Sequence, residues 1–184
     1  MEIRITTNQI LKILQLLSWI IFIGLCIDAG GIAFSAFYTY FINAVNAKTS
    51  WQGMDLTSLY NFDSGYFLVT ALVMFIISVL KAIMFYITVK LFWKKKFDLS
   101  TLFSHILKRF ILSWCFLALG IALFAECGYN FSIWIESQGV ILDKLQFLYF
   151  AGADIWLFMA IILFLIAQIV KKGIEIQNEN DLTI

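Results

Sequence analysis

Four ionisable residues interrupt stretches of sequence that are otherwise apolar: Asp28, Lys81, Glu126 and Asp154. A charge inside a bilayer costs several kcal/mol unless it is paired or hydrated, so such residues normally face a partner or a water-filled cavity. A helix rises about 1.5 Å per residue, so heights along each stretch can be counted from the basic residues that flank it. On this count the three carboxylates lie about 24–26 Å above those basic residues, and Lys81 lies about 14 Å above them. We therefore expect the three acids to share one level, with Lys81 below it. All four residues are candidates for binding a ligand or a cation.

Three interpretations of this acidic level stay open. The acids can lie beside the headgroups of a bilayer whose apolar core is about 30 Å thick, where water hydrates them. They can instead converge on one pocket open to the outside, where their mutual repulsion favours uptake of a proton or a cation. Cys26 and Cys127 lie nearby, but no histidine does, so a metal site is the least favoured and no metal is assigned. Lys81 is expected to act as a counter-charge to the nearest acid.

The spacing of small and polar residues predicts which helix faces point inward. On the first stretch, Gly24, Asp28, Gly31 and Ser35 recur at helical intervals. On the fourth, the face that carries Asp154 continues through Phe158, Ile161 and Leu165. Small residues let helices approach closely in a membrane, and polar residues bond across the gap. We expect both faces to be packed against neighbouring helices.

The sequence holds no catalytic constellation. His105 is the only histidine and lies in a basic segment without a serine–aspartate or cysteine arrangement beside it. Glycine-rich phosphate loops, paired-cysteine motifs and zinc spacings are also absent. We expect a protein that is not an enzyme and needs no cofactor. Free thiols are favoured at the three cysteines, although a bridge between Cys26 and Cys127 stays open.

Four apolar stretches must position these residues. The chain has 184 residues, of which 62% are hydrophobic and 14% charged, whereas an ordinary domain has about half and a quarter. The stretches are long enough to cross a bilayer as helices, which predicts an all-α, integral membrane four-helix bundle in one domain. The first is too long for a cleaved signal peptide. The predicted spans cover residues 13–45, 66–89, 106–125 and 148–170, with a short tail over 171–184.

The two outer connections, about 46–65 and 126–147, are long enough for a helix lying on the surface or for a lid over the bundle. Trp51, in the first of them, is expected at the membrane–water interface, where an amphipathic ring prefers to lie. Residues 134–147 are the better candidate for the surface helix.

The basic residues are distributed unevenly. Because lysine and arginine near a span are retained in the cytoplasm, we expect both termini and the central connection to lie there, and the protein to be multi-pass in the cytoplasmic (inner) membrane. A nucleic-acid-binding surface is not expected. Ten of the 13 Lys and Arg lie on the predicted cytoplasmic side, namely Arg4, Lys12, Lys90, Lys94, Lys95, Lys96, Lys108, Arg109, Lys171 and Lys172.

The C-terminal segment carries a family resemblance. Lys172-Gly173 is followed by an acidic stretch that closes on Glu179-Asn180-Asp181-Leu182-Thr183-Ile184, and in this the chain resembles the bacterial domain of unknown function 2975, small four-span membrane proteins. Residues 94–100 and Lys108-Arg109 are similar to the family's basic loop, without its usual Pro and Asn. The resemblance implies no established enzymatic activity. The family's genes commonly neighbour one for a small helix-turn-helix regulator, which implies, by association, a membrane partner of such a regulator.

We therefore expect a non-enzymatic sensor or regulatory partner of a small cytosolic helix-turn-helix regulator. The segment from Glu179 to Ile184 would dock it, because an acidic stretch with Leu182 and Ile184 as apolar anchors suits that role, although a solvated chain end stays open. The alternative is a small proton- or cation-dependent transporter, channel or immunity-type protein that uses the acidic level. The expected contact is with the lipid bilayer and not directly with nucleic acid, and a homo-oligomer stays open.

Overall fold

The computed structural model describes residues 7–93, 104–142 and 149–181, and in these ranges it is almost entirely helical without a named strand. Four helices are long and apolar enough to cross a membrane, which confirms the all-α four-helix architecture and identifies a multi-pass membrane protein. The elements are α1 (Thr7–Phe41), η1 (Ala44–Thr49), η2 (Trp51–Gly53), α2 (Thr57–Phe62), α3 (Ser64–Trp93), α4 (His105–Ser137) and α5 (Ala153–Asp181).

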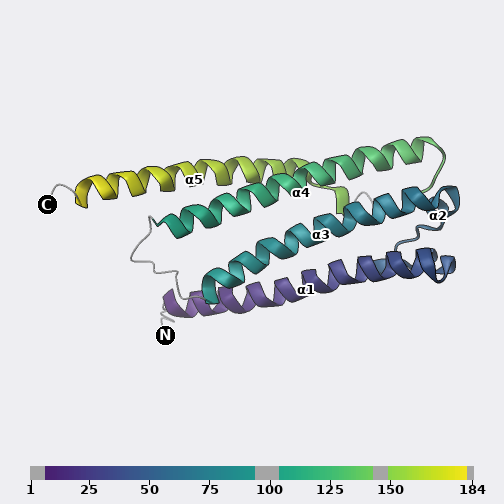
Figure 1. Cartoon of the computed structure of the whole chain (residues 1–184), viewed down its shortest axis with the longest axis horizontal. Helices are drawn as coiled ribbons and strands as arrows, with labels where there is room; N and C mark the ends of the chain where they lie inside the picture. The colour runs from purple at the N-terminus through teal and green to yellow at the C-terminus, as the bar shows by residue number, and fades with distance from the viewer. Residues whose placement is uncertain (1–6, 94–103, 143–148, 182–184) are drawn as a thin grey trace, which may run out of the picture.

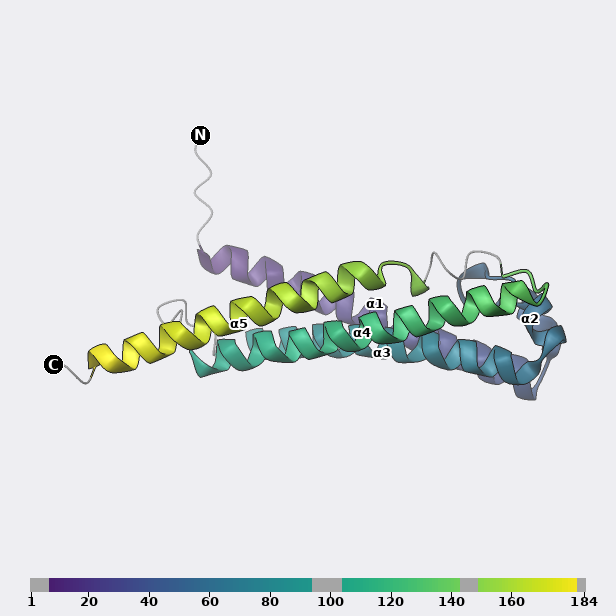
Figure 2. The ribbon, with the colours of Figure 1, turned by 90° about the horizontal axis from the view of Figure 1, so that it is seen from above.

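The long helices lie side by side in the order α1, α3, α4, α5 (Figure 1). The most extensive packing joins α4 to α5 and α1 to α3, and a smaller α3–α4 contact joins the two pairs. The start of α1 and the end of α5 lie at one end of the bundle, here called the terminal end, and the opposite end is the loop end (Figure 1). Seen from above, α5 begins part of the way along α4 and reaches beyond the other helices at the terminal end (Figure 2).

All four long helices extend past at least one of their predicted limits, and α4 and α5 do so by the most residues. The third span was expected to stop at residue 125, but α4 continues to Ser137, because Glu126 lies on its exposed side, where a charge does not interrupt the helix. The fourth was expected over 148–170, but α5 begins at Ala153 and continues to Asp181. It continues because Ile174, beyond the two lysines, is buried against α4 in a cluster with Ile111.

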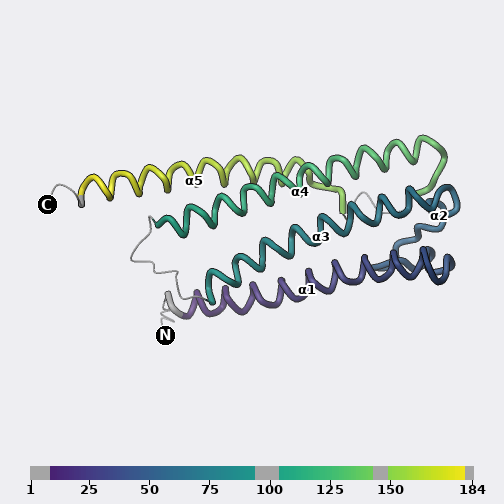
Figure 3. The backbone as a smooth tube through the Cα atoms, in the orientation of Figure 1, coloured from purple at the N-terminus to yellow at the C-terminus, as the bar shows by residue number. Residues whose placement is uncertain are grey.

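The connections at the loop end fold back into the bundle (Figure 3). Met54, Leu56 and Leu59 of the first connection and Val140 and Leu142 of the second are buried in the main apolar core with residues of α1, α3 and α4. The connections also contact each other, since the backbone N–H of Ile141 donates to Ser58 Oγ at 3.2 Å. Both therefore belong to the core of the protein. Of the expected surface helix over 134–147, the first residues belong to α4, and 143–148 lie outside the described residues.

Aromatic rings join α3 to α4 at the loop end. There the ring of Tyr66 lies 5.4 Å from that of Trp134 and 5.9 Å from that of Phe131, both in edge-on geometry, which is the favoured arrangement of aromatic pairs. At the terminal end a cavity lies between the last turns of α3 and the first turns of α4. We call this opening between the two helices the fork.

Candidate functional site

The carboxylate of Asp28, on α1, is the meeting point of four segments of the chain. Trp51 Nε1 and Gln52 Nε2, from the first connection, each donate to its Oδ1 at 2.8 Å. Tyr149 OH, from the segment before α5, donates to the same oxygen at 3.0 Å. Ser78 Oγ, on α3, donates to Oδ2 at 2.8 Å. We call these five residues the Asp28 cluster.

The cluster explains how a carboxylate is tolerated at this depth of the bundle. Burying a charge is costly unless hydrogen bonds replace its water, and hydrogen bonds to an ionised acceptor are stronger than neutral ones. Asp28 is half-buried, whereas Ser78 and Tyr149 are fully buried donors. The four donors are neutral, so the cluster supplies hydrogen bonds to the carboxylate but no positive charge.

Lys81 lies one helical turn from Ser78 on the same side of α3. Its Nζ lies 5.8 Å from the ring centroid of Trp156 on α5, a distance at which an ammonium is attracted to the aromatic face. The structure therefore brings Lys81 into the region of Asp28, which is the position expected of a counter-charge.

A glycine on α1 lets the first connection reach Asp28. A Cβ at Gly31 would collide with the indole ring of Trp51, so the ring lies directly on the helix backbone. The connection turns sharply at Gln52, whose φ of 61° is in the left-handed region that non-glycine residues rarely adopt. Such a conformation costs of order 1–3 kcal/mol and persists only where the surroundings hold it. The hydrogen bond from Gln52 to Asp28 supplies such a restraint.

A glycine on α4 likewise lets an aromatic ring of the second connection lie on a helix backbone. A Cβ at Gly128 would come within 2.5–2.9 Å of the ring of Phe150, so this ring also lies on a helix backbone. Phe150 is 2% exposed, and its neighbour Tyr149 points its hydroxyl to Asp28. Gly152, with a φ of 81°, then turns the chain into α5. The position of Tyr149, and with it the start of α5, is therefore tied to the Asp28 cluster.

Of the three interpretations of the acidic level, the one in which the three acids converge on a single pocket is wrong. Glu126 is exposed, and its Oε1 accepts from Asn130 Nδ2 at 3.0 Å on its own helix. Asp154 is exposed as well. Residues at a common level still point in different directions, and on α4 it is Ala125, 1% exposed, that faces the core beside Glu126. Only Asp28 of the three acids points into the bundle.

The predicted inward face of the fourth helix is also wrong. Phe158, Ile161 and Leu165, which share a face with Asp154, are 65%, 52% and 53% exposed. Close approach to α4 requires small side chains, and the bulky apolar face is left towards lipid. The face that packs against α4 instead carries Ala160, Ala167, Val170 and Ile174, all buried.

Four members of the cluster were not singled out by sequence. Trp51 was expected at the membrane interface, and Gln52, Ser78 and Tyr149 carry no charge and belong to no motif. The available signal was on α1, where Asp28 and Gly31 share the predicted inward face, and both meet Trp51 there. The direction in which a connection folds back is not encoded in such a face.

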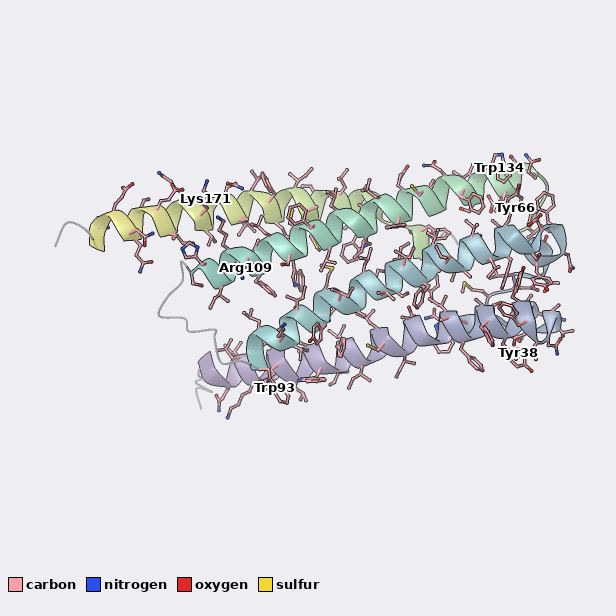
Figure 4. The ribbon with its side chains drawn as sticks, in the orientation of Figure 1. Tyr38, Tyr66, Trp93, Arg109, Trp134 and Lys171 are labelled. Carbon is pink, nitrogen blue, oxygen red and sulfur yellow. The ribbon has the colours of Figure 1, made fainter. Side chains whose placement is uncertain are left out.

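An open cavity of about 630 Å³ lies between α1 and the first connection, beside the Asp28 cluster. Its wall includes the hydroxyl-bearing Ser35 and Tyr38 of α1, the amide of Asn46, and both Trp51 and Gln52. Tyr38 lies near the loop end of α1 (Figure 4). Aromatic rings together with a few polar groups are the usual lining of a small-molecule site. The cavity therefore suits a small polar ligand that would touch two of the residues holding Asp28.

The remaining candidates lie elsewhere. Glu179 and Asn180, together with Asp181, belong to the last turns of α5, while Leu182, Thr183 and Ile184 fall outside the described residues. Cys26 and Cys127 are exposed and free, and no group of metal-ligating side chains occurs within the described ranges.

Comparison with known proteins leaves the chain without a family assignment. No family model, no curated protein and no solved structure matches it. Its function is therefore inferred from the geometry around Asp28 and from the arrangement of the helices.

Proposed function

We propose that the protein is a non-enzymatic membrane sensor that acts as the regulatory partner of a small cytosolic helix-turn-helix regulator. One observation carries the proposal: the carboxylate of Asp28 is hydrogen-bonded to both loop-end connections at once, through Trp51 and Gln52 on one side and Tyr149 on the other. A change at the first connection is thereby transmitted to the residue that precedes α5.

In this proposal a small polar molecule enters the 630 Å³ cavity and contacts Trp51 and Gln52. A ligand shifts a conformational equilibrium only if it binds one state better than the other. Here the two states differ in whether Gln52 and Trp51 hold Asp28 or the ligand. Release of these donors alters the position of Tyr149 and so the start of α5.

Helix α5 is the element that would carry the change to a partner. It packs against α4 along one face and extends beyond the other helices at the terminal end (Figure 2). Its last turns carry Glu175, Glu179 and Asp181, which suit a basic partner surface. The resemblance to the domain of unknown function 2975 supports a helix-turn-helix regulator as that partner, and it also supports placing the terminal end in the cytoplasm of a bacterial cell.

The alternative of a proton- or cation-dependent transporter, channel or immunity-type protein receives less support. It depended on three carboxylates sharing one pocket, and Glu126 and Asp154 are exposed and separate from Asp28. The remaining acid is surrounded by four hydrogen-bond donors. Such a carboxylate is better suited to holding structure together than to releasing an ion.

The test is a binding measurement with a small helix-turn-helix regulator, which the resemblance leads us to expect to be encoded beside the gene of this chain. The full chain in lipid nanodiscs should retain this regulator, and a chain ended after Gln177 should lose it. That truncation removes the acidic end but keeps Ile174, which packs against α4. Asp28→Asn should change the affinity as well, whereas Glu126→Gln should not. Equal binding by the full and the truncated chain would contradict the proposed partner.

A further inference from the structure

A second cavity, of about 430 Å³, lies in the fork between α3 and α4 at the terminal end. It lies nearer the terminal end of α3 than Ser78 does and shares no residue with the Asp28 cluster. One wall is formed by the last turns of α3 and the other by the first turns of α4. Figure 4 shows Arg109 near the start of α4 and Trp93 at the end of α3, on the two arms of the fork.

The lining combines positive charge with an apolar wall. Lys90 comes from α3, and His105 and Arg109 come from α4, so basic side chains enter the cavity from both arms. Ile87, Leu91 and Phe110 supply apolar surface to the lining. Among the residues that the structure describes, none that lines this cavity is acidic. The hydroxyl of Ser113 donates to the backbone carbonyl of Arg109 at 2.9 Å. Its proton is therefore not available to a ligand, and the basic side chains are the main polar groups of the lining.

The basic residues lie where an apolar span ends. Lys90 stands in the last turn of α3 and Arg109 in the second turn of α4, so their charged groups can reach the headgroup level while their aliphatic stems stay against apolar surface. The Nζ of Lys90 lies 5.9 Å from the ring centroid of Tyr86, a cation–π distance that holds the side chain beside the helix.

We propose that this cavity binds an anionic phospholipid of the surrounding bilayer. The phosphate lies between Lys90 and Arg109, and an acyl chain follows the wall formed by Ile87 and Phe110. Arginine suits this role because its planar guanidinium can make two parallel hydrogen bonds to phosphate oxygens. Basic cavities between membrane-spanning helices are a recurring kind of site for anionic headgroups.

A lipid fits this cavity better than a soluble anion because the lining has an exposed apolar part as well as basic groups. The cavity is open, and Ile106, one of its lining residues, is 44% exposed. A soluble anion would use only the basic groups and would leave the apolar wall uncovered. A phospholipid satisfies both parts of the lining and would fill the gap between the two helix pairs.

The experiment is native mass spectrometry of the full chain in detergent, titrated with phosphatidylglycerol or with phosphatidylcholine of the same acyl chains. The test variant is Lys90→Gln with Arg109→Gln. The matched control is Lys171→Gln with Lys172→Gln, which removes the same charge at the same end from α5, where Lys171 lies away from α3 (Figure 4). Arg109→Lys, which keeps the charge, shows whether the site tolerates a change that does not threaten the fold.

The proposal predicts that phosphatidylglycerol binds more tightly than phosphatidylcholine. The test variant should weaken this binding about tenfold or more, as expected for loss of charged hydrogen bonds, and the control by less than about twofold. Arg109→Lys should fall between the test variant and the unmodified chain. Equal weakening in the test and control variants, or no preference for phosphatidylglycerol, would overturn the proposal. Displacement of phosphatidylglycerol by millimolar inorganic phosphate would also overturn it, in favour of a soluble anion.

Discussion

Asp28 is the residue whose replacement should affect the fold most. Asparagine keeps one acceptor oxygen but loses the charge. Its amide N–H₂ faces either Ser78, at the Oδ2 position, or the three donors to Oδ1, namely Trp51, Gln52 and Tyr149. We expect Asp28→Asn to lower the free energy of unfolding by about 2 kcal/mol. This corresponds to a midpoint lowered by roughly 4–8 °C, measured by thermal unfolding in detergent.

Glu126→Gln is the matched control for this measurement, because it removes the same charge at a similar level. The glutamine can still accept from Asn130 on the exposed side of α4, so the change should be within about 0.5 kcal/mol. A similar loss in the two variants would show that Asp28 is not distinguished by its four donors.

The sequence allowed Asp28 and Lys81 to be selected because an intramembrane charge is rare and costly. Their partners could not be selected in the same way. Gln52 and Tyr149 are uncharged residues more than twenty positions away from Asp28, and only the path of the connections brings them there. Glu126 satisfied the same sequence criterion as Asp28 but lies on the exposed side of its helix.

The connections dock on the helices through two glycines, and one of these has a matched neighbour. Gly31→Ala introduces a Cβ that collides with the ring of Trp51, whereas the Cβ of Gly30→Ala meets nothing within 4 Å. We expect Gly31→Ala to destabilise the protein by about 1–3 kcal/mol, the usual range for overpacking. Gly30→Ala should be neutral or slightly stabilising, because alanine is the better helix former. Equal unfolding midpoints in detergent would contradict this docking.

The second connection gives an independent pair of variants on α4. The Cβ of Gly128→Ala would press on the ring of Phe150, whereas that of Gly120→Ala would make an ordinary contact, 3.5 Å from Leu80. Gly128→Ala should therefore lower the unfolding midpoint clearly more than Gly120→Ala. If Gly120→Ala were the more damaging variant, Phe150 would not lie on the backbone of α4 as described.

At the scale of elements, hydropathy predicted four spans but not their ends. A charged residue ends an apolar stretch in the sequence, but it ends a helix only if its side chain cannot reach a polar environment. Glu126 reaches one on the exposed side of α4. In the same way Lys171 and Lys172 pair with Glu175 within α5, at 3.8 and 3.3 Å, and the helix continues.

For the whole molecule, the uneven distribution of basic residues predicts the orientation in the membrane. Among the described residues, Lys12, Lys90, Arg109 and Lys171 lie near the terminal end and Lys48 at the loop end. Retention of basic residues in the cytoplasm then places both termini inside. Green fluorescent protein fused after Ile184 should fluoresce, and alkaline phosphatase fused there should be inactive. Active phosphatase at this position would reverse the orientation.

The sequence also predicted the overall architecture, because only helices can satisfy backbone groups across stretches of this length in lipid. It did not predict that the bundle consists of two closely packed helix pairs, α1–α3 and α4–α5, joined by a smaller contact between α3 and α4. That shape depends on which face of each helix carries small residues, and on α5 the small face, with Ala160 and Ala167, lies away from the face that carries Asp154.

The measurement that tests the Asp28 cluster most directly is hydrogen–deuterium exchange of the full chain and its Asp28→Asn and Glu126→Gln variants. Backbone N–H groups in residues 44–56 and 138–142 report on the two connections. If Asp28 holds both of them, Asp28→Asn will speed exchange in both ranges together, and Glu126→Gln will leave both as in the unmodified chain. Faster exchange in only one range, or in neither, would contradict the role assigned to Asp28.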